Sequence, residues 1–354
     1  MQYKYHLGID LHKRFAYWVV LDSEKKVRWR GRVETNAEAV QQALARLPVV
    51  REETHCAIEP VTEWGWYADL LQSERLRVRL VNTYRASITA KMRLKNDKVD
   101  ALVLAELLAA DYLPEAYLAP PATRDLREFM RNRIFLVRIR TRAKNRIHAI
   151  LARHALLCPW TDLFGKSGRV WLMQQALPPQ YDSERAMLLR VLDSVSAEIA
   201  TLQEQVAEKA SADRIATLLM SIPGIGAFTA MVMLAQIGDF SRFETPQQLG
   251  AFAGLVPSSY SSGGKERHGS ITKRGSPDLR WVMIEATNTV NAKRWGTLHD
   301  FYARIKMKKG SKVARVALAR KLLTIAWTLV MKKDEPFQAR PSLIKPKLLE
   351  VVAA

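Results

Sequence analysis

The chain has 354 residues, of which 48% are hydrophobic, so it is long enough for two or three compact domains and too long for one. Its 55 Lys and Arg residues against 35 Asp and Glu residues give a formal net charge of +20. This excess favours a polyanionic partner, and nucleic acid is the leading candidate. A basic surface that serves only solubility is the alternative. An anionic membrane surface is disfavoured as the partner, because neither end of the chain has the pattern of a basic amphipathic helix.

The cysteine and hydropathy patterns indicate the compartment. Cys56 and Cys158 are the only cysteines, and no Cys/His spacing is typical of a zinc site. No uncharged apolar run approaches the roughly 18 residues that span a bilayer, and residues 1–5 lack the apolar core of a signal peptide. We therefore expect a soluble cytoplasmic protein.

The first third of the chain alternates between strand and helix patterns. Strands are predicted at residues 6–10, 16–21, 27–33, 55–59 and 77–81, and helices at 35–47, at 64–72, from Tyr84 and from Asp97. A capping box from Thr35 to Glu38 opens the first helix. Three strands followed by alternating helix and strand are typical of a mixed-sheet α/β domain of the RNase H type.

Four acidic residues fall where such a fold gathers its chemistry. Asp10 and Glu59 close two predicted strands, and the carboxyl ends of strands are where open α/β sheets place their sites. Asp97 and Asp100, at the start of a predicted helix, leave the same helix face. Adjacent carboxylates repel each other unless they share a cation. The pattern predicts a divalent-metal site made of Asp10, Glu59, Asp97 and Asp100.

The middle of the chain, after a Pro-bounded linker at 113–121, is helical and basic. From Arg124 to Arg153, basic residues interleave with apolar ones, so one face suits a core and the other a phosphate backbone. We take Arg138, Arg142 and Arg146 as candidate backbone contacts, and a merely solvated face is the alternative. After a loop rich in Pro and Trp, apolar residues from Leu188 to Val206 form a coiled-coil seam. Its partner is either the basic helix or a second subunit.

Two further segments suggest phosphate contacts. The run from Leu218 to Gly226 predicts a helix, a Pro-Gly-x-Gly turn and a second helix, in which Gly224 and Gly226 would expose backbone N–H groups to a phosphate. An ordinary turn between helices is the alternative. The composition of residues 258–280 then predicts a surface loop, with five basic residues near several serines: Lys265, Arg267, Lys273, Arg274 and Arg280. Spacing alone gives a serine nucleophile little support there. Basic helices should follow to about Lys333, and then an irregular tail.

Five motifs in this order resemble one family, the DEDD transposases of the insertion sequence 110 family, to which Piv-type invertases are related. The motifs are Gly8-Ile9-Asp10, Ile58-Glu59-Pro60, Asn96-Asp97-Lys98-Val99-Asp100-Ala101, Ile222-Pro223-Gly224-Ile225-Gly226, and Tyr260-Ser261-Ser262-Gly263-Gly264-Lys265 with 271–275. Two departures are Asn96, where many relatives have Thr, and Pro60-Val61-Thr62 after Glu59. Neither removes a candidate ligand.

The resemblance implies a RuvC-like domain that binds Mg²⁺, with Mn²⁺ as a substitute, through Asp10, Glu59, Asp97 and Asp100. It also implies a transposase domain whose serine attacks DNA, which matches Ser261, with the adjacent Ser262 as the fallback. Donor and target double-stranded DNA, a structured guide RNA and a homo-oligomer between dimer and tetramer are the implied partners. The implied setting is a bacterial or archaeal cell, at the nucleoid, with no membrane contact.

These observations predict a DNA transposase or site-specific recombinase. Expected divisions are a metal-binding domain at 1–117, a basic coiled-coil region at 118–210, a transposase domain at 211–334 and a tail at 335–354. Because the acids and the serine are far apart in sequence, the active site should be composite. A RuvC-like nuclease without a covalent intermediate, a Piv-like invertase without guide RNA and a non-catalytic nucleic-acid scaffold are the alternatives.

Overall fold

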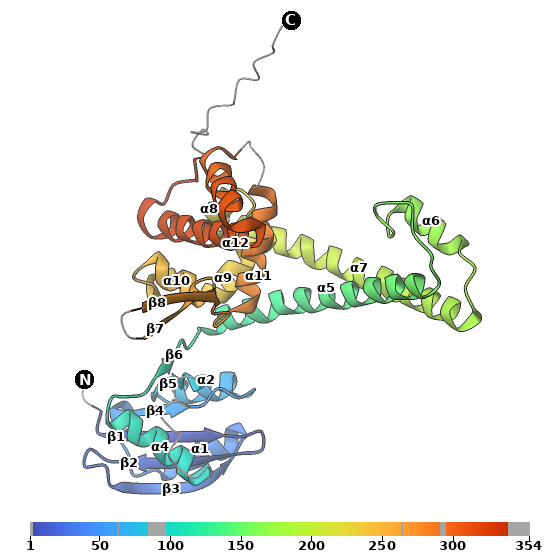
Figure 1. Ribbon diagram of the computed structural model, residues 1–354. Coiled ribbons are helices and arrows are strands. Elements are labelled where there is room, and N and C mark those ends of the chain that lie inside the picture. Colours follow the sequence, from blue (N-terminus) through green and yellow to red (C-terminus); the bar gives the residue numbers. More distant parts are fainter. Residues whose placement is uncertain (1–2, 63, 84–96, 263–264, 291–294, 339–354) are drawn as a thin grey trace, which may run out of the picture. The chain divides into compact units, whose positions relative to one another are not determined.

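A computed structural model describes residues 3–62, 64–83, 97–262, 265–290 and 295–338, apart from the side chains of 97–99, 259–268 and 333. The chain divides into two compact units, Met1–Pro121 and Ala122–Ala354, which run from blue to green and from green to red in Figure 1. The helix predicted from Tyr84 lies outside the described residues. No helix in the described part of the chain is long and apolar enough to cross a membrane.

The N-terminal unit is built on a six-stranded mixed sheet with the order β3-β2-β1-β4-β5-β6. Strands β1 (Tyr5–Leu11), β2 (Phe15–Leu21) and β3 (Val27–Glu34) form an antiparallel meander, and β4 (Thr54–Ile58) and β5 (Arg77–Val81) extend the sheet parallel to β1. The five predicted strands are confirmed. β6 (Glu115–Ala116) pairs antiparallel with β5, so the predicted linker in fact contributes an edge strand. This topology is consistent with an RNase H-like domain.

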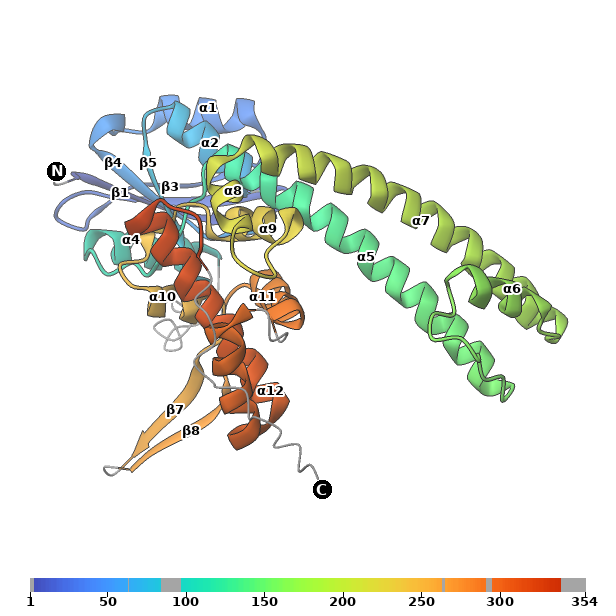
Figure 2. The same ribbon diagram turned by 90° about the horizontal axis from the view of Figure 1, so that it is seen from above.

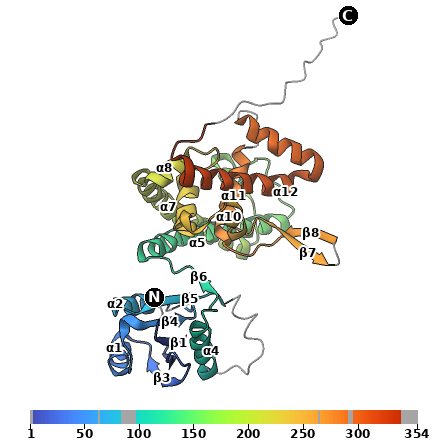
Figure 3. The same ribbon diagram turned by 90° about the vertical axis from the view of Figure 1, so that its left-hand side faces the viewer.

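Helices cover both faces of this sheet (Figure 3). α1 (Ala37–Arg46) and α2 (Trp64–Ser73) pack on the side chains of Leu7, Ile9 and Ile58. α4 (Asp97–Ala109) covers the opposite face, where Ala57 packs against its apolar side chains. Because side chains alternate between the two faces of a strand, consecutive residues of β1 and β4 pack against helices on opposite faces of the sheet.

The cap of α1 corrects the sequence prediction. Asn36, rather than Thr35, is the N-cap, and its side-chain oxygen accepts a hydrogen bond from the Ala39 backbone N–H at 2.8 Å. The Thr35 hydroxyl instead donates to the His12 carbonyl at 2.8 Å. Both residue types cap helices well, so the choice between neighbours was made by this tertiary contact.

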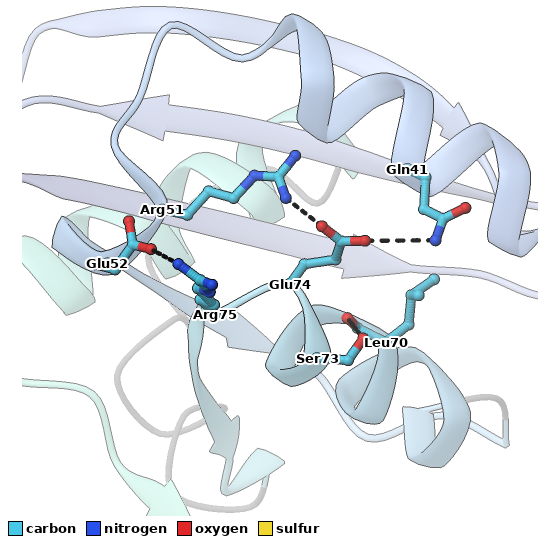
Figure 4. Close-up of polar contacts among 7 residues, drawn as sticks. All are labelled: Gln41, Arg51, Glu52, Leu70, Ser73, Glu74 and Arg75. Carbon is cyan, nitrogen blue, oxygen red and sulfur yellow. Dashed lines mark hydrogen bonds and ion pairs between the residues drawn. The ribbon is translucent and has the colours of Figure 1, made fainter.

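Polar contacts tie α1 and α2 to the turn η1 (Arg51–Glu53), which leads into β4 (Figure 4). The carboxylate of Glu74 accepts hydrogen bonds from Arg51 and, at 3.4 Å, from Gln41 of α1. Arg75 pairs with Glu52 at 3.1 Å. Within α2, the Ser73 hydroxyl donates to the Leu70 carbonyl at 2.7 Å. Exposed ion pairs contribute little to stability, so these contacts mainly orient the entry to β4.

The second unit contains two long antiparallel helices, α5 (Pro121–Arg153) and α7 (Pro179–Ala212). They run side by side, and α6 (Lys166–Gln174) lies near their far ends (Figures 1 and 2). The loop predicted between them therefore contains a helix. At the ends of the heptad seam, Val206 shares a buried cluster with Met130 and Ile134 of α5, and Leu188 packs against a cluster that contains Ile147. The basic helix of the same chain therefore covers these parts of the seam, and a second subunit as a further partner stays a prediction.

The remaining helices pack around one large core that includes Met130 and Ile134 of α5. They are α8 (Arg214–Met220), α9 (Ala227–Ile237), η2 (Phe240–Arg242), α10 (Pro246–Phe252), α11 (Pro277–Val290), α12 (Thr297–Thr328) and the π-helical turn η4 (Leu329–Lys333). α12 is kinked at Gly310, whose φ is 81°. α8, the turn and α9 confirm the predicted helix–turn–helix order.

The serine-rich segment is a two-stranded antiparallel hairpin, which corrects the expected irregular loop. β7 (Pro257–Ser262) pairs with β8 (Lys265–Ile271), with Ser261 opposite Glu266 and Ser262 opposite Lys265. Its Ser and Gly content gives little strand signal, so backbone pairing forms the hairpin. The Ser258 hydroxyl adds a hydrogen bond to the Ser270 carbonyl at 2.9 Å.

Candidate active site

Asp10 and Glu59 lie at the ends of two neighbouring parallel strands. Ile9 of β1 pairs with Ile58 of β4, so the two acids are the next residues in register. By strand alternation, Asp10 shares a face with Gly8 and Glu59 shares a face with Ala57. This is the face that α4 covers. The Asp10 side chain is 9% exposed, and Glu59 is half-buried.

Gly8 brings α4 close to this edge of the sheet. A Cβ at Gly8 would lie 2.0 Å from the Ala101 carbonyl oxygen and 2.6 Å from the Ala105 nitrogen. Only glycine therefore allows the helix backbone to approach β1 so closely. Asp100, which precedes Ala101, is half-buried. Asp97 is the first residue of α4, and its side chain lies outside the described residues.

His12 is a contact that sequence reasoning missed. Its Nε2 lies 3.0 Å from Oδ2 of Asp10, and the His12 side chain is 41% exposed. The spacing Asp10-Leu11-His12 was visible, because residues two apart in a strand share a face. Through this contact His12 orients the Asp10 carboxylate at the site.

The donor chemistry of these residues fits a divalent cation. Carboxylate oxygens are the ligands that hard cations prefer, and a nearly buried carboxylate such as Asp10 is best stabilised by a positive partner. Within the residues whose side chains are described, no group of three or more His, Cys, Asp or Glu forms a ready-made metal site. Asp97 is not among the side chains that this finding covers.

The base of the serine hairpin is fixed tightly in the second unit. Gly275 has φ of 114°, and a Cβ there would lie 1.9 Å from the Phe252 carbonyl oxygen of α10. Arg280 Nη1 donates to the carbonyls of Ala253 at 3.1 Å and Lys273 at 3.2 Å. Arg280 therefore holds the exit of β8 against α10. The side chains of Ser261, Ser262 and Lys265 lie outside the described residues.

The candidate DNA contacts differ in their surroundings. Arg138 pairs with Asp278 of α11 at 3.1 Å, and Arg146 pairs with Glu184 of α7, whose hydrogen bond and charge raise the pKa of Arg146. Arg142, between them on α5, is exposed, as are Lys273 and Arg274 beyond β8. These roles in nucleic-acid binding stay predictions.

The two turn glycines have different neighbours. Gly224 has φ of 84°, and a Cβ there would lie 2.3 Å from the Ala286 carbonyl oxygen, so α11 packs directly on the turn. Gly226 is the N-cap of α9, and the space where its Cβ would stand is open. The start of α9 is therefore accessible, which suits an anion.

Acids at adjacent strand ends of a mixed sheet, joined to a basic helical unit, define a class of enzymes that act on nucleic acids. Comparisons with known proteins agree. A model for the DEDD transposases of the IS110 group, described as a transposase, matches residues 7–155. A second, described as the transposase IS116/IS110/IS902 family, matches residues 216–303.

Individual relatives extend the match along the chain. The transposase for insertion sequence element IS1328 of Yersinia enterocolitica is 30% identical over 66% of this chain and 71% of its own length. A probable family 20 transposase of Pseudomonas aeruginosa is 28% identical over 92% of this chain and 97% of its own. The pilin gene-inverting protein of Moraxella bovis is 35% identical over 35% of this chain and 39% of its own.

The chain belongs to the insertion sequence 110 family of DEDD transposases. It is therefore an enzyme that acts on DNA as a transposase or recombinase, and the relationship to a pilin gene-inverting protein supports recombination as its chemistry. The DEDD domain suggests dependence on a divalent metal.

Proposed function

We propose that this protein is the transposase of an insertion sequence that cuts and rejoins DNA through Ser261, with Asp10, Glu59, Asp97 and Asp100 binding Mg²⁺. The observation that best supports this proposal is the placement of the acids at one edge of the N-terminal sheet. There Asp10 and Glu59 are next in register after Ile9 and Ile58, and the glycine at position 8 admits the helix that carries Asp100. Mn²⁺ would be an acceptable substitute, because both ions accept oxygen ligands.

In the proposed reaction, Ser261 and the acids act on the same phosphodiester. The serine Oγ forms a bond to phosphorus while the bond to the deoxyribose 3′-oxygen breaks, which leaves a 5′-phosphoserine link. The serine gives up its proton, and the departing oxygen takes one up. A new 3′-hydroxyl then attacks the link, which restores both the DNA backbone and the serine. Because the phosphodiester energy is kept, no nucleotide cofactor is needed.

The chain's own residues have defined tasks in this proposal. The acids would hold the divalent ion, and His12 keeps the Asp10 carboxylate in position through their 3.0 Å contact. A bound divalent ion would supply charge stabilisation at the phosphate. Arg280 keeps the serine hairpin at a fixed place on α10 through its bonds to Ala253 and Lys273. Exposed Lys273 and Arg274 would hold the DNA backbone near the hairpin.

The proposed partners follow from charge and family. A net charge of +20 suits both duplex DNA and a structured guide RNA, and α5 offers a long basic face. We expect the functional assembly to be a homo-oligomer, between a dimer and a tetramer, at the nucleoid.

A denaturing gel tests the proposal. Labelled element-junction DNA is incubated with Mg²⁺, copurified RNA and one of three proteins: wild type, Ser261→Ala or Ser262→Ala. We expect a protein-linked DNA band that is lost only with Ser261→Ala. Loss only with Ser262→Ala would move the nucleophile by one residue. Free cleaved DNA in all three lanes would instead indicate a RuvC-like nuclease that uses water.

A second candidate is an invertase that works without guide RNA. The similarity to a pilin gene-inverting protein favours it. Nuclease-treated protein that still recombines its DNA would support the invertase, whereas activity restored only by added element RNA would support the guided transposase.

A further inference from the structure

A small pocket with aromatic and cationic walls opens on the second unit, away from the hairpin residues considered above. It encloses about 250 Å³ between α5, α9 and α11, and its walls include Arg133, Val137, Arg140, Phe228, Trp281 and Glu285. Pockets for drug-sized ligands are typically larger, about 300 Å³ or more. This one therefore suits a single planar ring rather than a whole small molecule.

Two aromatic side chains give the pocket its flat surfaces. Phe228 and Trp281 meet edge to face, with ring centroids 6.1 Å apart. The guanidinium of Arg133 covers the Phe228 ring at 3.9 Å, which leaves the indole of Trp281 as the open surface. Trp281 is 37% exposed, a large fraction for a residue type that is usually well buried.

Positive charge surrounds these rings. Arg133 and Arg140 are two helical turns apart on α5 and line the same pocket, where they face the single carboxylate of Glu285. Burial and the charge of Arg140 lower the pKa of Arg133. Arg133 donates one hydrogen bond to Gln203 at 2.7 Å, but its Nε is buried without a hydrogen-bond partner. The protein alone therefore leaves an excess of cationic donors here.

Simpler explanations fit this combination less well. A packing defect would be closed and apolar, whereas this pocket is open and bears three charged side chains. A site for phosphate alone would not need an exposed indole. An exposed aromatic face beside arginines is instead the arrangement by which proteins stack an unpaired base and hold its backbone.

We propose that this pocket receives one unpaired nucleobase of a bound nucleic acid. The base stacks on Trp281, Glu285 accepts a hydrogen bond from its edge, and Arg133 and Arg140 hold the adjoining phosphate. The inference rests on the proposed nucleic-acid-binding function. DNA and RNA both carry the required chemistry, so the experiment compares the two.

The test uses the full-length protein and matched duplexes that contain no bulge, one bulged nucleotide or one bulged abasic site, in DNA and RNA form. Binding is measured by fluorescence anisotropy. For wild type, removal of the bulged base should weaken binding about tenfold, within the range of base–aromatic stacking. With Trp281→Ala this base-to-abasic ratio should fall to about one. Trp281→Phe should keep part of it.

A matched control is Trp160→Ala, since Trp160 is 53% exposed and lies outside the pocket. It should keep the wild-type ratio. Unbulged duplex should bind Trp281→Ala as well as wild type, which also shows that the variant is folded. Arg133→Lys, which keeps the charge but loses the planar guanidinium, should weaken binding of the bulged duplexes alone.

Several results would overturn the inference. One is a wild-type ratio near one on both DNA and RNA, and another is an unchanged ratio in Trp281→Ala. Equal weakening of all duplexes by Trp281→Ala would mean that the pocket contacts only the backbone. If wild type binds no nucleic acid at all, the proposed function fails too, which is a separate and recognisable outcome. If the base-to-abasic ratio exceeds one only for DNA or only for RNA, that nucleic acid supplies the base.

Discussion

The backbone of Gly8 in β1 lies directly against the backbone of Ala101 in α4, with a would-be Cβ only 2.0 Å from the Ala101 carbonyl oxygen. This contact joins the first predicted acid, Asp10, to the helix that carries Asp97 and Asp100. The position of α4 on the sheet therefore depends on the absence of one methyl group.

Gly8→Ala should push α4 away from the sheet. Overpacking of this kind costs about 1–3 kcal/mol, so we expect the melting temperature of the N-terminal unit to fall by several degrees and DNA cleavage to fall with it. Gly250→Ala in α10 is the control, because a Cβ there meets only Arg320 side-chain atoms, at 3.6 Å or more. A Gly8→Ala protein that melts and cleaves like wild type would contradict this account of the contact.

Divalent ions should stabilise the folded protein through Asp10. A ligand that binds only the native state raises its stability with concentration, so Mg²⁺ or Mn²⁺ should raise the melting temperature of wild type. Asp10→Asn removes a charged ligand and should abolish the shift as well as cleavage. Glu24→Gln is the control, since Glu24 is an acid of the same unit whose side chain is 70% exposed. An Asp10→Asn protein that still cleaves at the normal rate would refute the proposed mechanism.

A buried histidine pair should make the N-terminal unit sensitive to acid. His6 Nδ1 and His55 Nε2 are 2.5 Å apart. Burial, together with the nearby charges of His6 and Arg79, lowers the pKa of His55 to about 4, and burial also lowers the pKa of His6. In the unfolded chain these histidines take up protons at about pH 6.5. Between pH 6.5 and 4, the unfolded chain therefore holds more protons than the native state.

Above pH 6.5 the histidine pair should therefore leave the free energy of unfolding unchanged. As the pH drops from 6.5 towards 4, the free energy of unfolding should fall, and His55 should account for at most about 3 kcal/mol of the loss. Hydrogen exchange of the β1 and β4 amides at pH 7 and pH 5 measures this locally. His55→Phe should flatten the pH dependence, whereas His148→Gln, at an exposed position on α5, should not. Equal pH dependence in all three proteins would rule out the pair as its source.

Two neighbouring arginines on α5 should contribute unequally to nucleic-acid binding. Arg142 is exposed, while Arg146 is held by Glu184 through two hydrogen bonds. Each phosphate contact adds about 0.9 to the slope of log affinity against log salt. Arg142→Gln should lower that slope by about this amount, and Arg146→Gln should lower it by less.

Glu184→Gln supplies the converse measurement, because it frees Arg146 and should strengthen binding at low salt. Its cost in stability should be small, since the pair lies at the surface. Identical slopes for the Arg142→Gln and Arg146→Gln proteins would show that the ion pair does not limit Arg146.

Local patterns determined much of the N-terminal unit and all of its candidate acids. The strand that carries Asp10 and the strand that precedes Glu59 were predictable because each is a short, largely apolar segment. The heptads of α7 were predictable from their helical period, and the helix that begins at Asp97 from the apolar run that follows it. The choice of Asn36 over Thr35 as a cap was not, because a contact with His12 decided it.

Tertiary structure decided what the local patterns left open. The serine hairpin depends on backbone pairing that its residue types do not favour, and the packing of the heptad seam on α5 depends on shared clusters such as that of Val206 with Met130. Arg138 meets Asp278, 140 positions along the chain, and Trp281 reaches the pocket beside Arg133 across a similar separation. A sequence shows which residues repeat within a few turns or strands. Which distant side chains neutralise, cover or join one another is set only by how the elements pack.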